Sequence, residues 1–306
     1  MLQLDAGTAR RSGLVPRVAF TTVAEGNLAL HVDDDAQAVH RRRAAVAAAL
    51  GADRVHYMNQ VHSADVAVVP GVPDADARRA EDPSVADAAP TADALVTGDD
   101  GAALAVMVAD CVPVVLVGVP ARPGTGSAGR EGPDGAEGPG GRDGHSGVVR
   151  AVAHAGRRGL LSGILPATVA RMRAVAASAH QGSRPDGPVA DADAGLEITA
   201  WIGPSICGAC YEVPEAMARQ AEAEQPGISA TTSWGTASLD LPGAAAAQLR
   251  SGGVAVVPSG ICTLEDARFY SYRRDSRCGR FAGLAWMGPA SGDRAGTAAD
   301  TTGGSR

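Results

Sequence analysis

The sequence predicts a mixed α/β fold in which a single domain combines mixed β-sheets with flanking helices. Three observations support this class. Strand-like and helix-like segments alternate irregularly along the chain, which argues against a strictly parallel α/β arrangement. At 306 residues, of which 45% are hydrophobic, the chain can bury an extensive core. Aromatic residues are only 3% of the total, so that core must consist mainly of Ala, Val, Leu and Ile.

Short runs rich in Val, Ile and Leu indicate the strands. They are expected at 17–23 and 28–32, in two pieces within 54–70, on both sides of the Gly-Asp-Asp-Gly turn at 98–101, and at 148–156, 196–203, 254–260 and the end of 264–288. The segment 104–120 is expected to be one strand that is buried on both faces, because it is almost entirely apolar. Two residues, Asp110 and Cys111, interrupt it.

Cap residues mark the ends of the helices. Asp33–Asp35 suit the N-cap and first turn of a helix whose C-cap is Gly51, and Pro214 suits the start of another. Helices are therefore expected at 33–51, 160–178, 213–225 and, ending at Gly252, within 238–253.

Composition also sets the domain boundaries. We expect one domain over 17–287, interrupted by a disordered insertion at 120–147 that is dominated by Gly, Pro and isolated charges. Residues 1–16 and 288–306 are expected to be flexible tails.

Charge and cysteine content exclude several classes of function. The net charge is −7 with acidic and basic residues intermixed, which argues against a nucleic-acid surface. No apolar stretch reaches the length of a membrane span or a signal peptide. Five cysteines is a small, odd number, so reduced thiols in the cytoplasm are expected rather than a disulfide framework.

Three residues with metal-ligating side chains lie at or near predicted strand ends: His62, Cys111 and His154. Two histidines and one cysteine form a known catalytic zinc set that leaves a fourth position open. Their wide separation in the sequence is no local motif, so spacing alone favours three unconnected residues: a core histidine, a buried inert cysteine and a histidine in a turn.

The same residues allow two other interpretations. Cys111 and His154 could form a nucleophile–base dyad, with Asp110 or Asp65 orienting the imidazole. A type 1 copper site with Met107 as axial ligand is disfavoured, because a strand does not bring residues four apart to one metal.

A second cysteine motif, Cys207–Cys210, has the spacing of redox and zinc sites. No second such pair completes a zinc ribbon, although Cys262 and Cys278 remain available, so a packing role is favoured. Arginines cluster at Arg157–Arg158 and within 273–280, where guanidinium groups suit phosphate or carboxylate.

Taken in order, several motifs resemble one family. They are NQVHSADV, DALVT, GAALAVMVADCVPVVLV, VAHAGRRG, WIGPSICGACYEV and FYSYRRD with GRFAGLAWM, and they extend from Val18 to Met287. They resemble the YfiH/YlmD-like laccase-domain proteins, also called multicopper polyphenol oxidoreductases. The resemblance implies a YfiH-like fold, shared with cytotoxic-necrotizing-factor-like deamidases, and a zinc site formed by His62, Cys111 and His154, with copper the less favoured metal.

The resemblance also implies an activity. It is a purine nucleoside phosphorylase that acts on adenosine, inosine, guanosine and methylthioadenosine and that also deaminates adenosine. The partners would be purine nucleosides and phosphate, and the protein a monomer or homodimer. Phosphate is expected at Arg158 and at Arg273 or Arg274. The alternatives are a Cys–His hydrolase or amidase that acts on cell-wall precursors, and a non-catalytic metal-binding partner protein.

The sequence departs from the family pattern at four places, one of which is an alanine where the helix before Gly252 usually has an asparagine. A glycine-rich N-terminal segment is shortened to TTVAEGN, an asparagine position is His40, and the tryptophan of the HAGWRG motif is Arg157. These departures lie near expected substrate contacts, so the substrate range is open. Asp110 is expected to face away from the metal and to bond backbone amides or an arginine.

Overall fold

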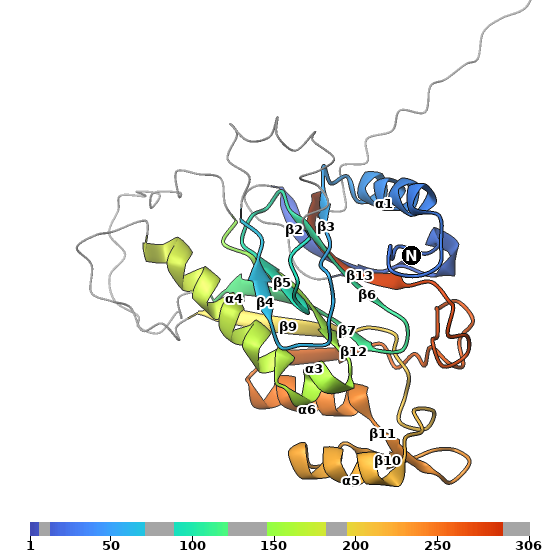
Figure 1. Cartoon of the computed structure of the whole chain (residues 1–306). Coiled ribbons are helices and arrows are strands. Elements are labelled where there is room, and N and C mark those ends of the chain that lie inside the picture. The colour runs from blue at the N-terminus through green and yellow to red at the C-terminus, as the bar shows by residue number, and fades with distance from the viewer. Residues whose placement is uncertain (6–12, 71–88, 122–145, 182–194, 290–306) are drawn as a thin grey trace, which may run out of the picture.

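Two mixed β-sheets pack face to face between layers of helices in the computed structural model, which describes residues 1–5, 13–70, 89–121, 146–181 and 195–289 (Figure 1). The five-stranded sheet comprises, from edge to edge, β1 (Leu2–Asp5), β2 (Leu14–Phe20), β13 (Phe281–Pro289), β6 (Ala103–Val108) and β3 (Val55–His56). The six-stranded sheet comprises β12 (Ala255–Pro258), β9 (Leu196–Ile202), β7 (Val112–Pro120), β8 (Val149–Ala155), β5 (Ala94–Thr97) and β4 (Val66–Val68). Each sheet contains parallel and antiparallel pairs, which confirms the predicted mixed α/β domain.

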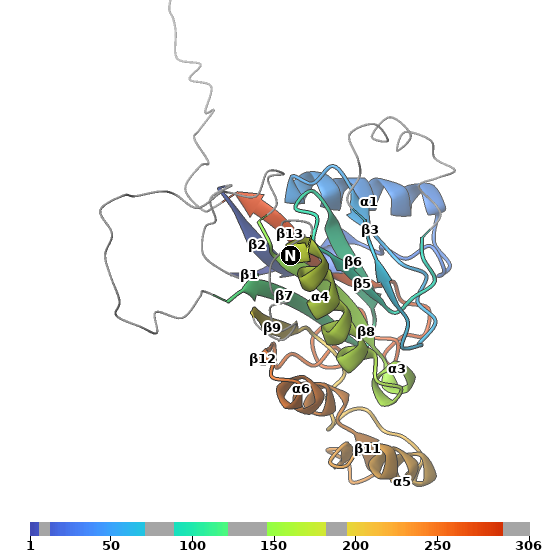
Figure 2. The same ribbon diagram turned by 90° about the vertical axis from the view of Figure 1, so that its left-hand side faces the viewer.

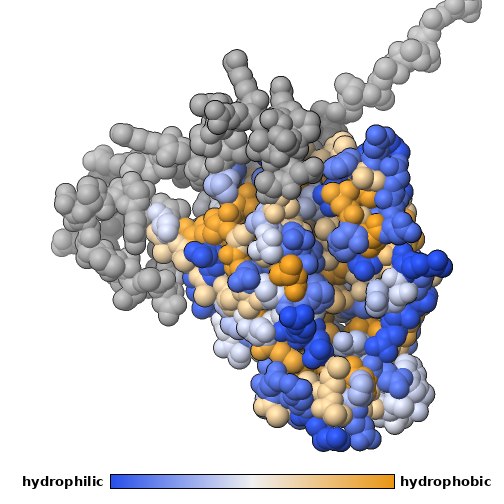
Figure 3. Space-filling model, viewed as in Figure 1, coloured by the Kyte–Doolittle hydropathy of each residue, from blue (hydrophilic) through white to orange (hydrophobic). Residues whose placement is uncertain are grey.

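Helices cover the outer face of each sheet. Helix α1 (Ala36–Leu50) covers the five-stranded sheet, and α4 (Ile164–Gln181) and α6 (Leu241–Ser251) cover the six-stranded sheet. Helix α5 (Glu215–Glu224) lies beside a hairpin formed by β10 (Ser229–Thr231) and β11 (Ala237–Leu239). The remaining elements are the short helix α3 (Arg157–Leu161) and a 3-10 turn, η1 (Val23–Glu25). Hydrophilic and hydrophobic residues are mixed over the surface around α1 (Figure 3). The hairpin and α5 lie at the end of the molecule farthest from α1 (Figure 2).

This layering explains why β6 and β7 are apolar on both faces. In β6, Leu104 and Val106 point into the core between the sheets, whereas Ala103 and Ala105 pack in the core beneath α1. Strand β7 alternates in the same way between the inter-sheet core and the core beneath α4 and α6. The period of two therefore buries β6 and all but the last two residues of β7 against one layer or the other.

The expectation of a single strand at 104–120 is wrong. Strands β6 and β7 belong to different sheets, and Ala109, Asp110 and Cys111 form the link between them. An apolar run buried on both faces gives no periodic signal at the point where the chain leaves one sheet for another. The backbone turns at Asp110, whose φ of 83° lies in the left-handed region.

The helix caps are confirmed, but one predicted strand is wrong. Helix α1 begins at Asp35, whose carboxylate accepts the amides of residues 37 and 38, and ends at Gly51 with a φ of 65°. The segment 28–32 is not a strand. The Asn27 side chain bonds both the amide and the carbonyl of Ala29, which takes these backbone groups out of any ladder.

The ends of the chain differ in part from the expected tails. Residues 2–5 form β1, which pairs antiparallel with β2. Strand β13 extends to Pro289. Most of the insertion predicted at 120–147 and most of the tail predicted at 288–306 lie outside the described residues, which omit 122–145 and 290–306. Within the described ranges, no helix has both the length and the apolar character needed to cross a membrane.

A glycine after β9 keeps the two sheets in contact, and this gives a test of the packing. A Cβ added at Gly203 would collide with the ring of Phe20, which is fully buried between the sheets. Gly203→Ala should lower the free energy of unfolding in urea by about 1–3 kcal/mol, as overpacking does. Gly98→Ala is the matched control, since its Cβ would meet only Val175 at an ordinary 3.4 Å. Equal stability of the two variants would contradict the inter-sheet packing.

Candidate active site and metal centre

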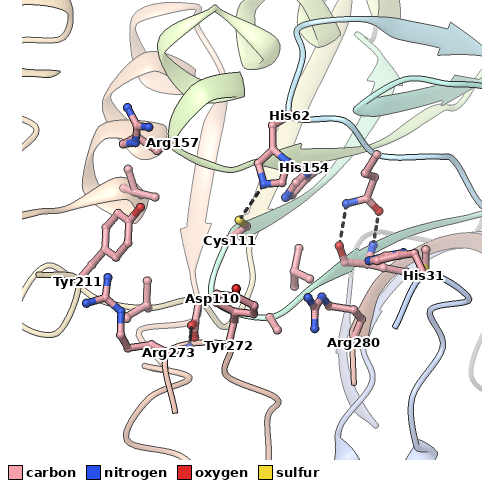
Figure 4. Close-up of a pocket in the computed structure, with 16 residues that line it drawn as sticks. His31, His62, Asp110, Cys111, His154, Arg157, Tyr211, Tyr272, Arg273 and Arg280 are labelled. Atoms are coloured by element: carbon pink, nitrogen blue, oxygen red, sulfur yellow. Dashed lines mark hydrogen bonds between the residues drawn. The ribbon is translucent and has the colours of Figure 1, made fainter. Parts of the chain in front are cut away.

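The structure brings the three predicted ligands together at one end of the sheets (Figure 4). His62 lies in the loop between β3 and β4, Cys111 in the link between β6 and β7, and His154 near the end of β8. Their donor atoms all lie within 4.8 Å of one another. The Sγ atom of Cys111 is 3.7 Å from Nε2 of His62, and the two imidazole rings meet edge to face with centroids 4.5 Å apart.

A buried carboxylate, Asp93, holds two of these ligands. It stands directly before β5 and is fully buried. Its Oδ1 atom lies 2.8 Å from Nδ1 of His154 and accepts the amide of His62 at 2.9 Å. Its Oδ2 atom accepts the amides of Val61 and Ser63 and the Ser63 hydroxyl. With Nδ1 bonded to a carboxylate, His154 presents Nε2 to the site, as in carboxylate–histidine–metal arrangements.

Sequence reasoning missed Asp93 and named Asp65 or Asp110 as the group that orients the histidine. Asp65 is exposed, and the Asp110 carboxylate is bonded elsewhere. The available signal was an acidic residue at the entry of the buried strand in DALVT, where an unpaired carboxylate would be costly. It could not be distinguished from the many other aspartates without knowledge of which strand lies beside β5.

The loop that carries His62 is fixed on both sides. Gln60 donates to the carbonyl of Met107 at 2.7 Å and accepts its amide at 2.9 Å, as a strand residue would. On the other side, Asn59 pairs with Thr91. These bonds and Asp93 hold His62 at a φ of 62°, a left-handed conformation that costs a non-glycine residue of the order of 1–3 kcal/mol.

Asp110 supports a wall of the site and does not join the ligands. Its carboxylate accepts the hydroxyl of Thr263 at 2.7 Å and the amide of Arg273 at 2.6 Å. It therefore bonds a backbone amide as expected. The reason is the turn between the two sheets, however, and not the alternation of side chains along a strand.

Electrostatics favour a charged thiolate–imidazolium pair in the protein without a metal. Burial disfavours the Cys111 thiolate, but His154 and His62 outweigh it through charge and hydrogen bonding and lower the pKa of Cys111 to about 6. Burial likewise opposes charge on His154, but Cys111 and Asp93 raise its pKa to about 9. The pKa of Asp93 lies well below its usual range, because the bonds from His154 and from the amides of residues 62 and 63 outweigh its burial.

The space between the ligands fits a metal ion. A Cβ added at Gly156 would come within 2.7 Å of Cδ2 of His62 and 3.0 Å of Cys111 Sγ. Glycine thus leaves open a volume that any other side chain would fill. Two imidazoles, one thiol and a second-layer carboxylate are donors that suit Zn²⁺, and His₂Cys also occurs in copper sites.

A cavity of about 380 Å³ opens beside the three ligands. Its volume lies within the range of about 300–1,000 Å³ that is typical of small-molecule sites. Arg157, Tyr211 and Arg273 lie on one side of the ligands, and His31 and Arg280 on the other (Figure 4). The Arg273 guanidinium lies 5.3 Å from the centroid of the Tyr211 ring and donates to the carbonyl of Glu212.

The predicted phosphate-binding arginines are placed differently from one another. Arg273 lines the cavity. Arg158 is exposed and lies outside the lining, whereas its neighbour Arg157 is part of it. Arg274 directs its guanidinium to the backbone carbonyls of residues 263, 264 and 269. Which of two adjacent arginines faces the cavity depends on how α3 begins, and the sequence does not show this.

Fold and site together define an α/β protein with a potential metal-binding Cys/His group beside a small-molecule cavity. The profile of the multi-copper polyphenol oxidoreductase laccase family matches residues 5–132 and 143–288. The chain belongs to this family.

Its relatives include purine nucleoside phosphorylases by name. One from Streptomyces coelicolor is 41% identical over 266 residues, which is 86% of this chain and 88% of that protein. One from Corynebacterium glutamicum is 38% identical over 89% of this chain and 94% of that protein. Among solved structures, YlmD from Geobacillus stearothermophilus is 27% identical with a TM-score of 0.60, covering 94% of this chain and 96% of that one. A Neisseria meningitidis protein is 28% identical with a TM-score of 0.62, covering 94% and 99%.

Asp93→Asn should weaken metal binding although it removes no ligand. An amide NH₂ group cannot accept hydrogen bonds, so at least one donor from the loop or from His154 loses its partner whichever way the amide is turned. The affinity for added Zn²⁺, measured by chelator competition, should fall about 10- to 100-fold, as for other second-layer carboxylates. Asp65→Asn is the matched control: it changes an exposed carboxylate on the loop that carries His62 and should leave the affinity for Zn²⁺ unchanged. Equal affinities would contradict the role given to Asp93.

Gly156→Ala tests the space between the ligands directly. The φ of Gly156 is −70°, which alanine adopts without strain, so the backbone should tolerate the change. The added methyl group would occupy the space between His62 and Cys111, and binding of Zn²⁺ by the three residues should be lost while the far-UV circular dichroism stays that of the wild type. Binding of as many zinc ions per chain as in the wild type, with the same affinities, would show that the ligands do not converge as described.

Proposed function

We propose that this protein is a zinc-dependent purine nucleoside phosphorylase of the cytoplasm that also deaminates adenosine. The observation that carries the proposal is the convergence of His62, Cys111 and His154 at a cavity lined by arginine and tyrosine side chains. The relatives named purine nucleoside phosphorylase support the substrate class.

The residues of the cavity suit the requirements of phosphorolysis. In this reaction a phosphate oxygen forms a bond to C1′ of the ribose, while the C1′–N9 bond breaks and the purine takes its electron pair. A phosphate dianion must therefore be held close to the ribose, and a guanidinium group does this through paired hydrogen bonds. Arg157 and Arg273 lie on the same side of the cavity and are proposed to bind the phosphate.

Tyr211 and Tyr272 are proposed to contact the nucleoside. Both line the cavity, and the ring of Tyr272 is 54% exposed, so that a purine base could stack on it. On the other side, burial and the charges of Arg280, Arg43 and His154 lower the pKa of His31. A neutral imidazole at pH 7 can both donate and accept a hydrogen bond, which suits recognition of a purine edge.

A zinc ion, when bound by His62, Cys111 and His154, would supply Lewis acidity for activating water in the deamination and for polarising the substrate. The protein's own part is to hold Cys111 as a thiolate and to orient the two imidazoles, so that the proton on Nε2 of His154 leaves when the ion binds. Asp93 holds the proton of His154 at Nδ1, away from the site, and the ordered loop at residues 59–63 keeps His62 in place.

One observation favours a second candidate, a Cys–His hydrolase or amidase. The lowered pKa of Cys111 and its 3.7 Å approach to His62 are also what a thiolate nucleophile requires. The two functions differ in whether metal suppresses or supports reactivity. A nucleophilic Cys111 would be alkylated by iodoacetamide and would be needed in the free state, whereas a ligand would be protected by zinc.

Turnover of adenosine by the zinc-loaded protein tests the proposal. Phosphate-dependent release of adenine and ribose 1-phosphate is expected, with inosine formed in the absence of phosphate. Chelation should abolish both reactions, and added Zn²⁺ should restore them. Activity that survives chelation but is lost on alkylation of Cys111 would favour the hydrolase, and no turnover of any purine nucleoside would favour a non-catalytic protein.

The same assay assigns the phosphate site. Arg157→Ala should raise the KM for phosphate by about tenfold or more, since a charge-assisted hydrogen bond contributes roughly 1.5–3 kcal/mol. Arg158→Ala is the matched control, because that exposed neighbour lies outside the cavity lining. If only Arg158→Ala raised the KM for phosphate, the phosphate would be assigned to Arg158, as expected from the sequence.

A further inference from the structure

A second cluster of metal-ligating side chains lies apart from the site described above. It consists of Cys207, Cys210, Cys262 and Glu265, whose donor atoms all lie within 4.8 Å of one another. Cys210 and Cys262 are buried, and Glu265 closes the cluster from the solvent side. We propose that these four residues bind a structural zinc ion that is independent of the proposed activity.

The sheet brings the two halves of the cluster together. Strands β9 and β12 are parallel neighbours, so the loops that follow them leave the same edge. Cys207 and Cys210 follow β9, and Cys262 and Glu265 follow β12. The loops are joined by backbone hydrogen bonds from the amide of Ser205 to residue 261 and from residue 263 back to Ser205. The ligand positions therefore rest on a continuation of the sheet.

Each half has the form of a two-ligand turn. The amides of Cys210 and Tyr211 both donate to the carbonyl of Cys207, which closes a turn with two residues between the thiols. The amide of residue 266 donates to the carbonyl of Cys262, which closes the Cys-x-x-Glu turn. Paired turns with two intervening residues are the usual framework of four-ligand structural zinc sites.

One contact fits a metal-bound thiolate, because the amide of Cys207 donates to Sγ of Cys262 at 3.4 Å. The Cys210 thiol donates to a carboxylate oxygen of Glu265 at 3.5 Å, which places these two donors side by side, and its proton would leave when the ion binds. An amide directed at sulfur stabilises a thiolate, as outer hydrogen bonds to metal ligands do. Arg274, bonded to the carbonyls of residues 263 and 264 in the same turn, places positive charge nearby.

The donor set selects the class of metal. Three thiolates and a carboxylate make four ligands, which fill the tetrahedral shell of Zn²⁺ and leave no position for a substrate. On binding, the thiols release their protons to solvent and no electrons are exchanged. The site is therefore structural, unlike the three-ligand site at Cys111.

The ion would brace the cavity wall. Ile206 and Tyr211 stand on either side of the Cys207–Cys210 turn and line the cavity. Thr263, between Cys262 and Glu265, donates to the Asp110 carboxylate, which also accepts the amide of Arg273. One ion would thus fix the two loops that carry this wall.

Cobalt binding to the Cys111→Ser protein under reducing conditions tests the proposal. This variant removes the only thiol of the first site, so absorption from thiolate-to-cobalt charge transfer must arise elsewhere. One equivalent of Co²⁺ with this absorption is expected, and Zn²⁺ should displace it. Zn²⁺ should also raise the Tm of the variant, because a preformed four-ligand site binds the ion more tightly than the unfolded chain does.

Two double variants locate the ion. Adding Cys262→Ser to Cys111→Ser should abolish both the absorption and the rise in Tm. Cys278 belongs to neither cluster, so adding Cys278→Ser to Cys111→Ser should leave the absorption and the rise in Tm in place. The proposal is overturned if reduced Cys111→Ser binds no metal through sulfur, because the three thiols would then only pack together. Retention of the absorption in the Cys262 variant would overturn it as well.

Discussion

The buried carboxylate of Asp93 is the constraint on which the candidate metal site depends. A carboxylate in a fully buried position must have its charge compensated by hydrogen bonds. Asp93 obtains them from the loop at 61–63 and from His154, so the same bonds that stabilise the charge bring two ligands from distant parts of the chain together. They also hold His62 in a backbone conformation that it would not adopt alone.

The position of the third proposed ligand depends on the architecture of the domain. Cys111 stands where the chain passes from the five-stranded to the six-stranded sheet, and both sheets are covered on their outer faces. Asp110 turns the chain at this point and fastens it to the loops at 263 and 273. The chemistry therefore lies at the end of the sheet sandwich, where the chain can expose polar groups to a cavity without interrupting a ladder.

Much of the site could be predicted from the sequence, because its ligands are rare residue types at the ends of strands and the motifs resemble one family. Asp93 could not, since its partners lie far away in sequence and aspartate is abundant in this chain. The break at Ala109–Cys111 was hidden because the residues on both sides of it are buried on both faces. The apolar residues at 28–32 predict a strand, but the Asn27 side chain bonds the amide and carbonyl of Ala29 that a strand would use for pairing.

X-ray absorption at the zinc edge of the Cys262→Ser variant, loaded with one equivalent of zinc, tests the central claim most directly. This variant lacks one thiolate of the cluster at Cys207–Cys210, so the ion should occupy the site held by Asp93 and its partners. We expect one sulfur at about 2.3 Å and two imidazole nitrogens at about 2.0–2.1 Å. A shell without sulfur, or without imidazole, would contradict the assignment of His62, Cys111 and His154 as the ligands.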